Sequence, residues 1–215
     1  LRNQITGISI VKENDQNIYV KAGAGEIWHE FVLHCIEKNW AGLENLSLIP
    51  GSVGASPMQN IGAYGVEIKD VFHELSAYHI ESGAIHTFSK EQCQFGYRES
   101  IFKRALKNQY IIIDVTFALA KNPKLQTSYG AIQNELDIKG IQNPTIRDIS
   151  NAVIAIRQSK LPDPAILGNA GSFFKNPVVD SATFSSIQQK FPDVAHYVVS
   201  ANEIKLAAGW LIERA

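Results

Sequence analysis

The sequence has few cysteines, almost no excess charge and no long apolar run. Cys35 and Cys93 are the two cysteines among 215 residues; they lie far apart and form no C-x-x-C pair. This excludes a disulfide framework and favours a reducing cytosol. Twenty basic and 21 acidic residues leave a net charge of -1, so attraction to nucleic acid or anionic lipid has no evident source. The longest apolar stretch, Tyr110 to Ala120, is too short to span a bilayer and contains Asp114. No signal peptide opens the chain. We expect a soluble protein of the cytoplasm with neither a nucleic-acid nor a membrane partner.

Several common catalytic and binding signatures are also missing. The sequence contains no G-x-G-x-x-G, no G-x-x-x-x-G-K-[ST] and no H-E-x-x-H, and Ser172 is not part of a G-x-S-x-G elbow. The six histidines lack the spacing of metal ligands. These absences give no support for a Rossmann fold, a P-loop, a serine hydrolase or a metal site.

What is present predicts a globular α+β chain. Apolar residues make up 45% and charged residues 19%. In the first 160 residues, alternation predicts two hairpins, Ile8–Lys12 with Asn17–Lys21 and Phe72–Ile80 with Ala84–Phe88. It also predicts a long strand, Gln109–Ala120, with Ile111, Ile113, Val115 and Phe117 on one face. Helical spacing predicts two helices, Glu26–Asn39 and one from the Thr145 capping box to near Ser159. Leu161-Pro-Asp-Pro164 is a rigid stop and a domain seam. Beyond it, two further helices are predicted around Phe184, Ile187 and Phe191 and around Leu206, Trp210 and Leu211.

Both ends of the sequence look internal to a longer protein. The chain begins with Leu1 instead of Met and stops at Ala215, within an apolar run that is typical of a helix and carries no C-cap signal. We therefore expect a piece of a larger polypeptide.

The segment from Asn45 to Val66 carries no charged residue and is rich in glycine, serine and amides. Glycine lets main chain approach a neighbour that a Cβ would exclude, so a planar or phosphorylated cofactor could lie directly against this backbone. On that interpretation, a side chain at Gly54 or Gly62 would fill the space of the cofactor. The alternative is a buried, turn-rich connection between a strand and a helix.

Arg98 lies beside Tyr97 in a short run between apolar residues. Its guanidinium keeps its charge and presents a planar fork of donors, which suits a carboxylate or a developing enolate. The alternative is a surface ion pair with Glu99 or a neighbouring acid.

Ser172 follows two glycines and precedes two aromatic residues. Without a partner base it is a poor nucleophile, but its hydroxyl can donate a proton to a strongly basic carbanion. The alternative is a helix N-cap or turn serine. Lys160, Lys175 and Lys205 are candidates for phosphate or carboxylate contacts, or else solvated surface lysines.

Four motifs in order resemble one family. They are Ala41–Gly65 (AGLENLSLIPGSVGASPMQNIGAYG), Gly96–Lys103 (GYRESIFK), Lys160–Pro164 (KLPDP) and Gly168–Pro177 (GNAGSFFKNP). Together they resemble the UDP-N-acetylenolpyruvoylglucosamine reductases, the MurB family. The resemblance implies an FAD-binding domain of the vanillyl-alcohol-oxidase/PCMH type over residues 1–160 and the start of an α+β substrate-binding domain over 161–215.

The activity implied is one of peptidoglycan precursor synthesis. Hydride from NADPH passes by way of FAD to the enolpyruvyl double bond of UDP-N-acetylglucosamine enolpyruvate, giving UDP-N-acetylmuramate. By resemblance, Arg98 stabilises the carbanion or enolate and Ser172 donates the proton. The other residues carried over are those of the substrate site (Tyr97, Tyr129, Lys160, Asn176, Lys205) and of the flavin site (Pro50, Gly51, Ser52, Gly54, Ser56, Gln59, Asn60, Gly62, Gly65). The segment around Tyr129, Thr127-Ser-Tyr-Gly130, is similar to the tyrosine loop of the longer subtype of the family.

Two elements of the family are missing from the sequence. A Gly-Ser-Asn loop for the FAD pyrophosphate is expected before Leu1, and a catalytic glutamate is expected after Ala215, so we expect the isolated chain to be inactive. Two other hypotheses stand beside the reductase. One is an oxidase or dehydrogenase of the same superfamily, and the other is a non-catalytic nucleotide-sugar binding module.

Overall fold

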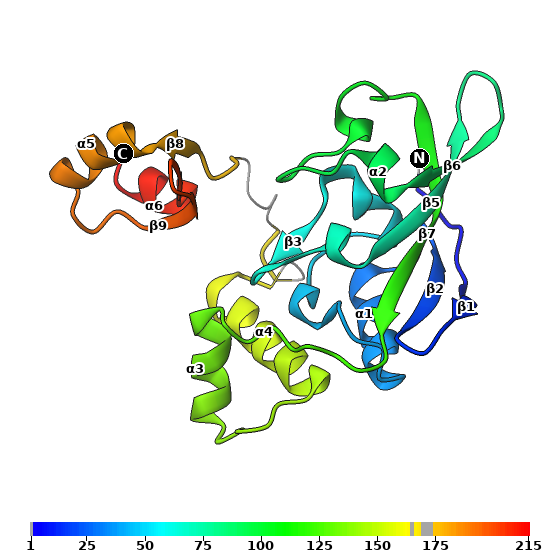
Figure 1. Ribbon diagram of the computed structural model, residues 1–215, viewed down its shortest axis with the longest axis horizontal. Coiled ribbons are helices and arrows are strands. Elements are labelled where there is room, and N and C mark those ends of the chain that lie inside the picture. The colour runs from blue at the N-terminus through cyan, green and yellow to red at the C-terminus, as the bar shows by residue number, and fades with distance from the viewer. Residues whose placement is uncertain (1, 164–165, 169–173) are drawn as a thin grey trace. The chain divides into compact units, whose positions relative to one another are not determined.

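The computed structural model describes residues 2–163, 166–168 and 174–215. The chain divides into two compact units, Leu1–Asp163 and Pro164–Ala215 (Figure 1). The division falls within Leu161-Pro-Asp-Pro164, where two prolines restrict the backbone. Among the described residues, no helix is both long and apolar enough to cross a membrane.

Strands and short helices alternate along the first unit. Its strands are β1 (Ile8–Glu13), β2 (Asn17–Gly23), β3 (Gly62–Ala63), β4 (Val66–Glu67), β5 (Phe72–His79), β6 (Ile85–Ser89) and β7 (Tyr110–Ala120). Its α-helices are α1 (Trp28–Glu37), α2 (Lys90–Cys93), α3 (Gly130–Ile138) and α4 (Ile146–Lys160). Short 3-10 helices cover Glu44–Leu46, Val53–Ala55, Pro57–Gln59, Ile68–Asp70 and Ile101–Lys103.

An antiparallel sheet with the order β1-β2-β7-β5-β6 forms the centre of this unit (Figure 1). Both predicted hairpins and the α1 helix are confirmed. Sheet and α1 side chains form much of the core, joined by residues of the intervening turns such as Leu46 and Val53. In it, the rings of Trp28 and Phe31 pack against Phe117 at 6.0 and 5.3 Å. Burying these large rings contributes about 1.5–3 kcal/mol per side chain.

The long strand β7 differs from the prediction in which face it buries. Ile111 is exposed, whereas Ile112, Val115 and Phe117 are buried. The pairing with β5 is irregular, because Ser76 pairs with Asp114 while Ala77 pairs with Ile112. The extra residue, Ile113, inverts the alternation, so a single face for all four predicted residues was wrong.

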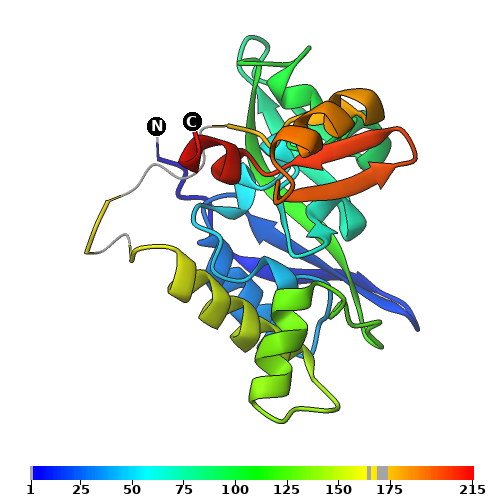
Figure 2. The same ribbon diagram turned by 90° about the vertical axis from the view of Figure 1, so that its left-hand side faces the viewer.

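The helices α3 and α4 lie side by side and have a small core of their own (Figures 1 and 2). Helix α4 begins as predicted at the Thr145 capping box, where Thr145 Oγ1 accepts the N–H of Asp148 at 3.3 Å. The apolar stripe expected along it from the helical spacing of Ile146, Ile149, Val153 and Ile156 is buried. Helix α3 was not predicted, because only Ile132 and Leu136 along it are fully buried.

The second unit contains a three-stranded sheet with the order β8-β10-β9, formed by Val178–Asp180, Glu203–Leu206 and His196–Ser200. Helices α5 (Ser181–Lys190) and α6 (Ala208–Glu213) complete it. The predicted helices are confirmed except at Leu206, which ends β10 and lies in the small core with Ile204. The two residues point to the same side of the strand, since their spacing is two.

Candidate functional site

The uncharged segment 45–66 runs along the first unit as a chain of short turns that alternately buries and exposes its side chains. Trp28 Nε1 donates to the Leu46 carbonyl at 2.9 Å and fixes the start of the segment to α1. Of the nine residues predicted to bind flavin, Pro50, Gly51, Gln59 and Gly65 are exposed, Ser52, Gly54 and Gly62 are half-buried, and Ser56 and Asn60 are buried. The hydroxyl of Ser56 donates to the Val53 carbonyl at 2.8 Å. The segment is thus both a packed connection and an exposed, uncharged main-chain surface.

Two of its glycines make room for protein atoms. A Cβ on Gly54 would lie 2.5 Å from Cβ of Ala24, and a Cβ on Gly62 would lie 2.9 Å from Nη1 of Arg98 and 2.7 Å from Cγ of Glu67. The expectation that side chains at these positions would meet the cofactor first is corrected, because protein atoms already occupy the direction of each missing side chain. Gly51 is different: its φ is +117° and an added Cβ would meet nothing within 4 Å.

Arg98 sits at the tip of a two-residue turn. Gly96 and Glu99 exchange two backbone hydrogen bonds of 3.0 and 3.2 Å across it, and Arg98 has a φ of 53°. A non-glycine residue in this left-handed region costs about 1–3 kcal/mol and often marks a functional position. The buried hydroxyl of Ser100 donates to the Met58 carbonyl at 2.7 Å and ties the turn to the uncharged segment.

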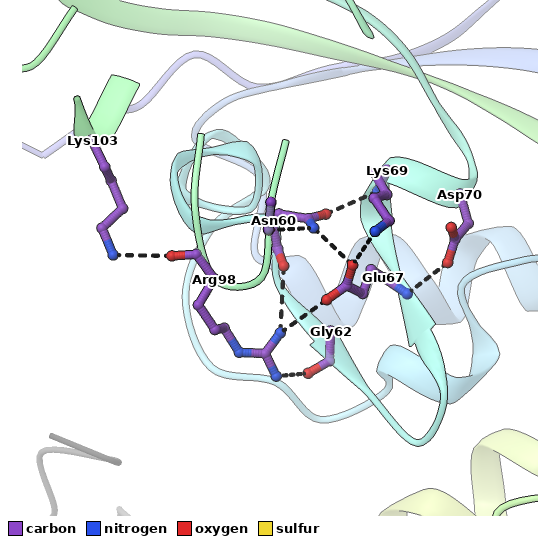
Figure 3. Close-up of polar contacts among 8 residues, drawn as sticks. Asn60, Gly62, Glu67, Lys69, Asp70, Arg98 and Lys103 are labelled. Carbon is purple, nitrogen blue, oxygen red and sulfur yellow. Dashed lines mark hydrogen bonds and ion pairs between the residues drawn. The ribbon is translucent and has the colours of Figure 1, made fainter. Parts of the chain in front are cut away.

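The Arg98 guanidinium reaches the same segment (Figure 3). It donates to the carbonyl of Asn60 at 3.4 Å and, through a short bond, to the carbonyl of Gly62. The Glu67 carboxylate lies beside it, with Oε1 4.0 Å from Nη1 of Arg98. The two hydrogen bonds use two of the five N–H donors of the guanidinium, so the cation stays able to bind a further anion. Tyr97 places its ring 5.3 Å from the same guanidinium carbon.

Tyr129 contacts the uncharged segment through its ring. The Tyr129 ring packs edge-on against Tyr64 at 5.3 Å, and Asn45 Nδ2 donates to the carbonyls of Tyr64 and Gln126 at 3.1 and 3.0 Å. Lys160 is the exposed last residue of α4. Within unit 1, the Gly96–Lys103 motif and the Tyr129 segment therefore both contact residues 45–66.

Some residues of this cluster were not singled out from the sequence. Arg157, one turn before Lys160, donates to the Leu48 carbonyl at 3.1 Å. Burial raises the pKa of Tyr64, and Arg157 partly opposes that rise. Glu67 was also missed, although it is the first charged residue after the uncharged run, and that position is the signal that could have found it.

In the second unit, Asn176 and Lys205 have structural contacts of their own. Asn176 Oδ1 accepts the backbone N–H of Ala208 at 2.9 Å, at the start of α6. Lys205 lies on β10 with its ammonium 5.8 Å from the Tyr197 ring of the neighbouring strand. Ser172, the predicted proton donor, lies outside the described residues.

His29 links α1 to the uncharged segment and predicts a pH dependence of stability. Its Nδ1 accepts the N–H of Leu48 at 3.0 Å, and burial, aided by Arg157 and opposed by Glu30, lowers the pKa of His29 from 6.5. The imidazole of His29 therefore binds a proton more readily in the unfolded chain than in the folded one. The stabilisation of the folded state by neutral His29 is present above about pH 6.5 and is lost as the pH falls through the lowered pKa. We expect the urea midpoint to fall less between pH 7.5 and 5.5 in His29→Gln than in wild type, with His34→Gln as the control on the same helix. Parallel pH profiles of wild type and His29→Gln would contradict this.

Residues 2–89 match the family model described as an FAD binding domain. The site fits such a cofactor. The uncharged, partly exposed main chain at Gly51 and Ser52 can approach a planar ring closely, and Arg98 adds a cation held against Asn60 and Gly62 of the same segment. FAD is the cofactor of this domain.

Two relatives that match almost the whole chain carry the same name. The chain is 55% identical over 212 residues to the UDP-N-acetylenolpyruvoylglucosamine reductase of Flavobacterium johnsoniae, covering 98% of this chain and 63% of that protein. It is 54% identical over 215 residues to the protein of the same name from Pseudomonas savastanoi pv. phaseolicola, covering 100% of this chain and 63% of that protein. The crystal structure of UDP-N-acetylenolpyruvylglucosamine reductase (MurB) from Thermus caldophilus matches with a TM-score of 0.54 and 25% identity, over 73% of this chain and 48% of that one. The chain spans 63% of the length of the first two proteins, and it belongs to the family of the UDP-N-acetylenolpyruvoylglucosamine reductases.

Proposed function

We propose that this chain carries the flavin site and the anion-stabilising arginine of an NADPH-dependent reductase of UDP-N-acetylglucosamine enolpyruvate. The observation that carries the proposal is the position of Arg98, whose guanidinium is held against Asn60 and Gly62 of the uncharged segment. A fixed cation beside a site for a planar cofactor is what an enolate intermediate requires.

The residues divide the chemistry between them. Residues 1–160 are the FAD-binding part, and residues 161–215 belong to the substrate-binding part. When bound, FAD supplies the hydride. Arg98 holds the substrate carboxylate and stabilises the negative charge that develops next to it, and Ser172 donates the proton to the carbanion.

The remaining candidates bind the substrate. Tyr129 covers the nucleotide, Lys205 contacts the diphosphate, and Tyr97, Lys160 and Asn176 line the site. A lysine suits a diphosphate as a point charge on a flexible stem. We place the reaction in peptidoglycan precursor synthesis in the bacterial cytoplasm, where NADPH is the reductant.

The experiment that tests the function separates the two halves of the reaction in the whole protein as its gene encodes it. We expect the purified protein to hold FAD, NADPH to bleach its absorbance, and UDP-N-acetylglucosamine enolpyruvate to restore it. Ser172→Ala is expected to leave bleaching unchanged and to slow restoration by ~10²-fold or more, the scale of a lost general acid.

The outcomes also separate the alternatives. An oxidase or dehydrogenase of the superfamily has no carbanion to protonate, so Ser172→Ala would not act on one half-reaction alone. A protein without flavin would indicate a nucleotide-sugar binding module instead.

A further inference from the structure

Glu67, on β4, connects the uncharged segment to the arginine turn (Figure 3). Its Oε2 accepts from Asn60 Nδ2 at 3.0 Å and lies 2.8 Å from the Lys69 ammonium, while its Oε1 lies 4.0 Å from Nη1 of Arg98. The side chain of Glu67 is 22% exposed and that of Arg98 is 30% exposed. The pair is therefore largely shielded from the solvent screening that weakens surface ion pairs.

Asn60 contacts the same group of residues as Glu67. It is fully buried, and its Nδ2 also donates to the Gly96 carbonyl, at the base of the Arg98 turn, at 3.0 Å. Its Oδ1 accepts the backbone N–H of Lys69 at 3.1 Å. The Asn60 side chain, which the resemblance assigned to the flavin, is thus used in holding Glu67, the Arg98 turn and the β4 end together.

These contacts set the direction of the guanidinium. Two main-chain carbonyls, those of Asn60 and Gly62, fix one edge of its plane, and the Glu67 carboxylate attracts Nη1 from the side. At 4.0 Å the carboxylate orients the cation without a close hydrogen-bonded pair, because its nearer cation is Lys69. Arg98 can therefore keep its charge for a ligand while its direction is constrained.

We propose that Glu67 is a positioning residue for Arg98, held in place by Asn60, in the half-reaction that consumes the enolpyruvyl substrate. This inference rests on the proposed function. On this proposal, the negative charge of Glu67 acts through the Arg98 guanidinium and has no part in flavin binding or in reduction by NADPH.

The test compares Glu67→Gln with Lys69→Met in the whole flavoprotein. Glutamine keeps the shape of the side chain and an acceptor for Asn60 but removes the charge that faces Arg98. We expect Glu67→Gln to keep its flavin and its rate of reduction by NADPH within about 2-fold, and to slow reoxidation by substrate about 10- to 100-fold, the scale of a misdirected catalytic group. Lys69→Met removes the closer ion pair of the same carboxylate and is expected to reoxidise within about 2-fold of wild type.

A double variant decides whether the effect passes through Arg98. If it does, Glu67→Gln with Arg98→Met reoxidises no more slowly than Arg98→Met alone, because the loss is already complete. Independent losses that multiply would overturn the proposal, as would loss of flavin in Glu67→Gln or an equal loss of reoxidation in Lys69→Met. Each of these outcomes would make Glu67 a structural residue of the loop.

The urea midpoints of wild type, Glu67→Gln, Arg98→Met and the double variant give a readout that needs no substrate. Contact between Glu67 and Arg98 predicts that the two single shifts are not additive. Failure of the wild-type protein to turn over the substrate would reject the proposed function alone, whereas additive midpoints would reject the positioning role alone.

Discussion

Arg98→Met is expected to slow reoxidation of the reduced flavoprotein by substrate by ~10²–10³-fold, the cost of removing a charged or hydrogen-bonding stabiliser from a developing oxyanion. Methionine replaces only the aliphatic stem of arginine and carries no charge, so it cannot compensate the substrate carboxylate or the enolate beside it. The rate of reduction by NADPH should stay near that of wild type, since the Arg98 cation acts on the other substrate. Stopped-flow absorbance of the flavin measures both rates in the same preparation.

Arg98→Lys is the matched variant. A lysine keeps the positive charge, but it cannot donate in one plane to the carbonyls of Asn60 and Gly62, as the guanidinium does. We therefore expect Arg98→Lys to retain a trace of activity and Arg98→Met to retain less. Wild-type turnover in both would return Arg98 to the role of an ion-pair partner of Glu67.

Gly54→Val is expected to destabilise the first unit and, as a consequence, to lower its flavin content. The nearest atoms to a new Cβ are Cβ, Cα and the carbonyl oxygen of Ala24, at 2.5, 3.1 and 3.1 Å, and two of these belong to the backbone. The Gly54 N–H also donates to the Ala24 carbonyl at 3.0 Å, so the two main-chain segments cannot move apart without losing this hydrogen bond. Overpacking of this kind typically costs ~1–3 kcal/mol. Urea unfolding and the ratio of flavin to protein measure the two effects.

Gly54→Ala and Gly130→Ala form a matched pair for this prediction. An added Cβ at Gly130, the first residue of α3, meets nothing within 4 Å, so only the Gly54 variant should lose stability. A Gly54→Val protein that unfolds at the wild-type urea concentration but lacks flavin would support the original interpretation, in which the side chain takes the place of the cofactor.

Local signals in the sequence were sufficient for much of the fold. The Thr145 capping box and the apolar stripe of α4 lie within one helix, and each hairpin lies within about 20 residues, so neighbouring residues carry the information. The face of β7 could not be predicted in this way. It depends on the extra residue Ile113 opposite β5, and a bulge exists only in the pairing of two strands.

For the site, the sequence by itself determined the class of chemistry. Four motifs in order resembled one family, and that resemblance implied FAD, whereas the uncharged, glycine-rich segment 45–66 alone indicated a planar or phosphorylated cofactor or a packed connection. Only the tertiary structure decided what each residue touches. It brings Arg98 to Gly62, 36 residues earlier, gives Gly62 the task of making room for that guanidinium, and uses the Asn60 side chain within the protein. The reason is that these roles depend on the close approach of two turns distant in the chain, and such an approach is set by the packing of both turns and not by the residues of either one.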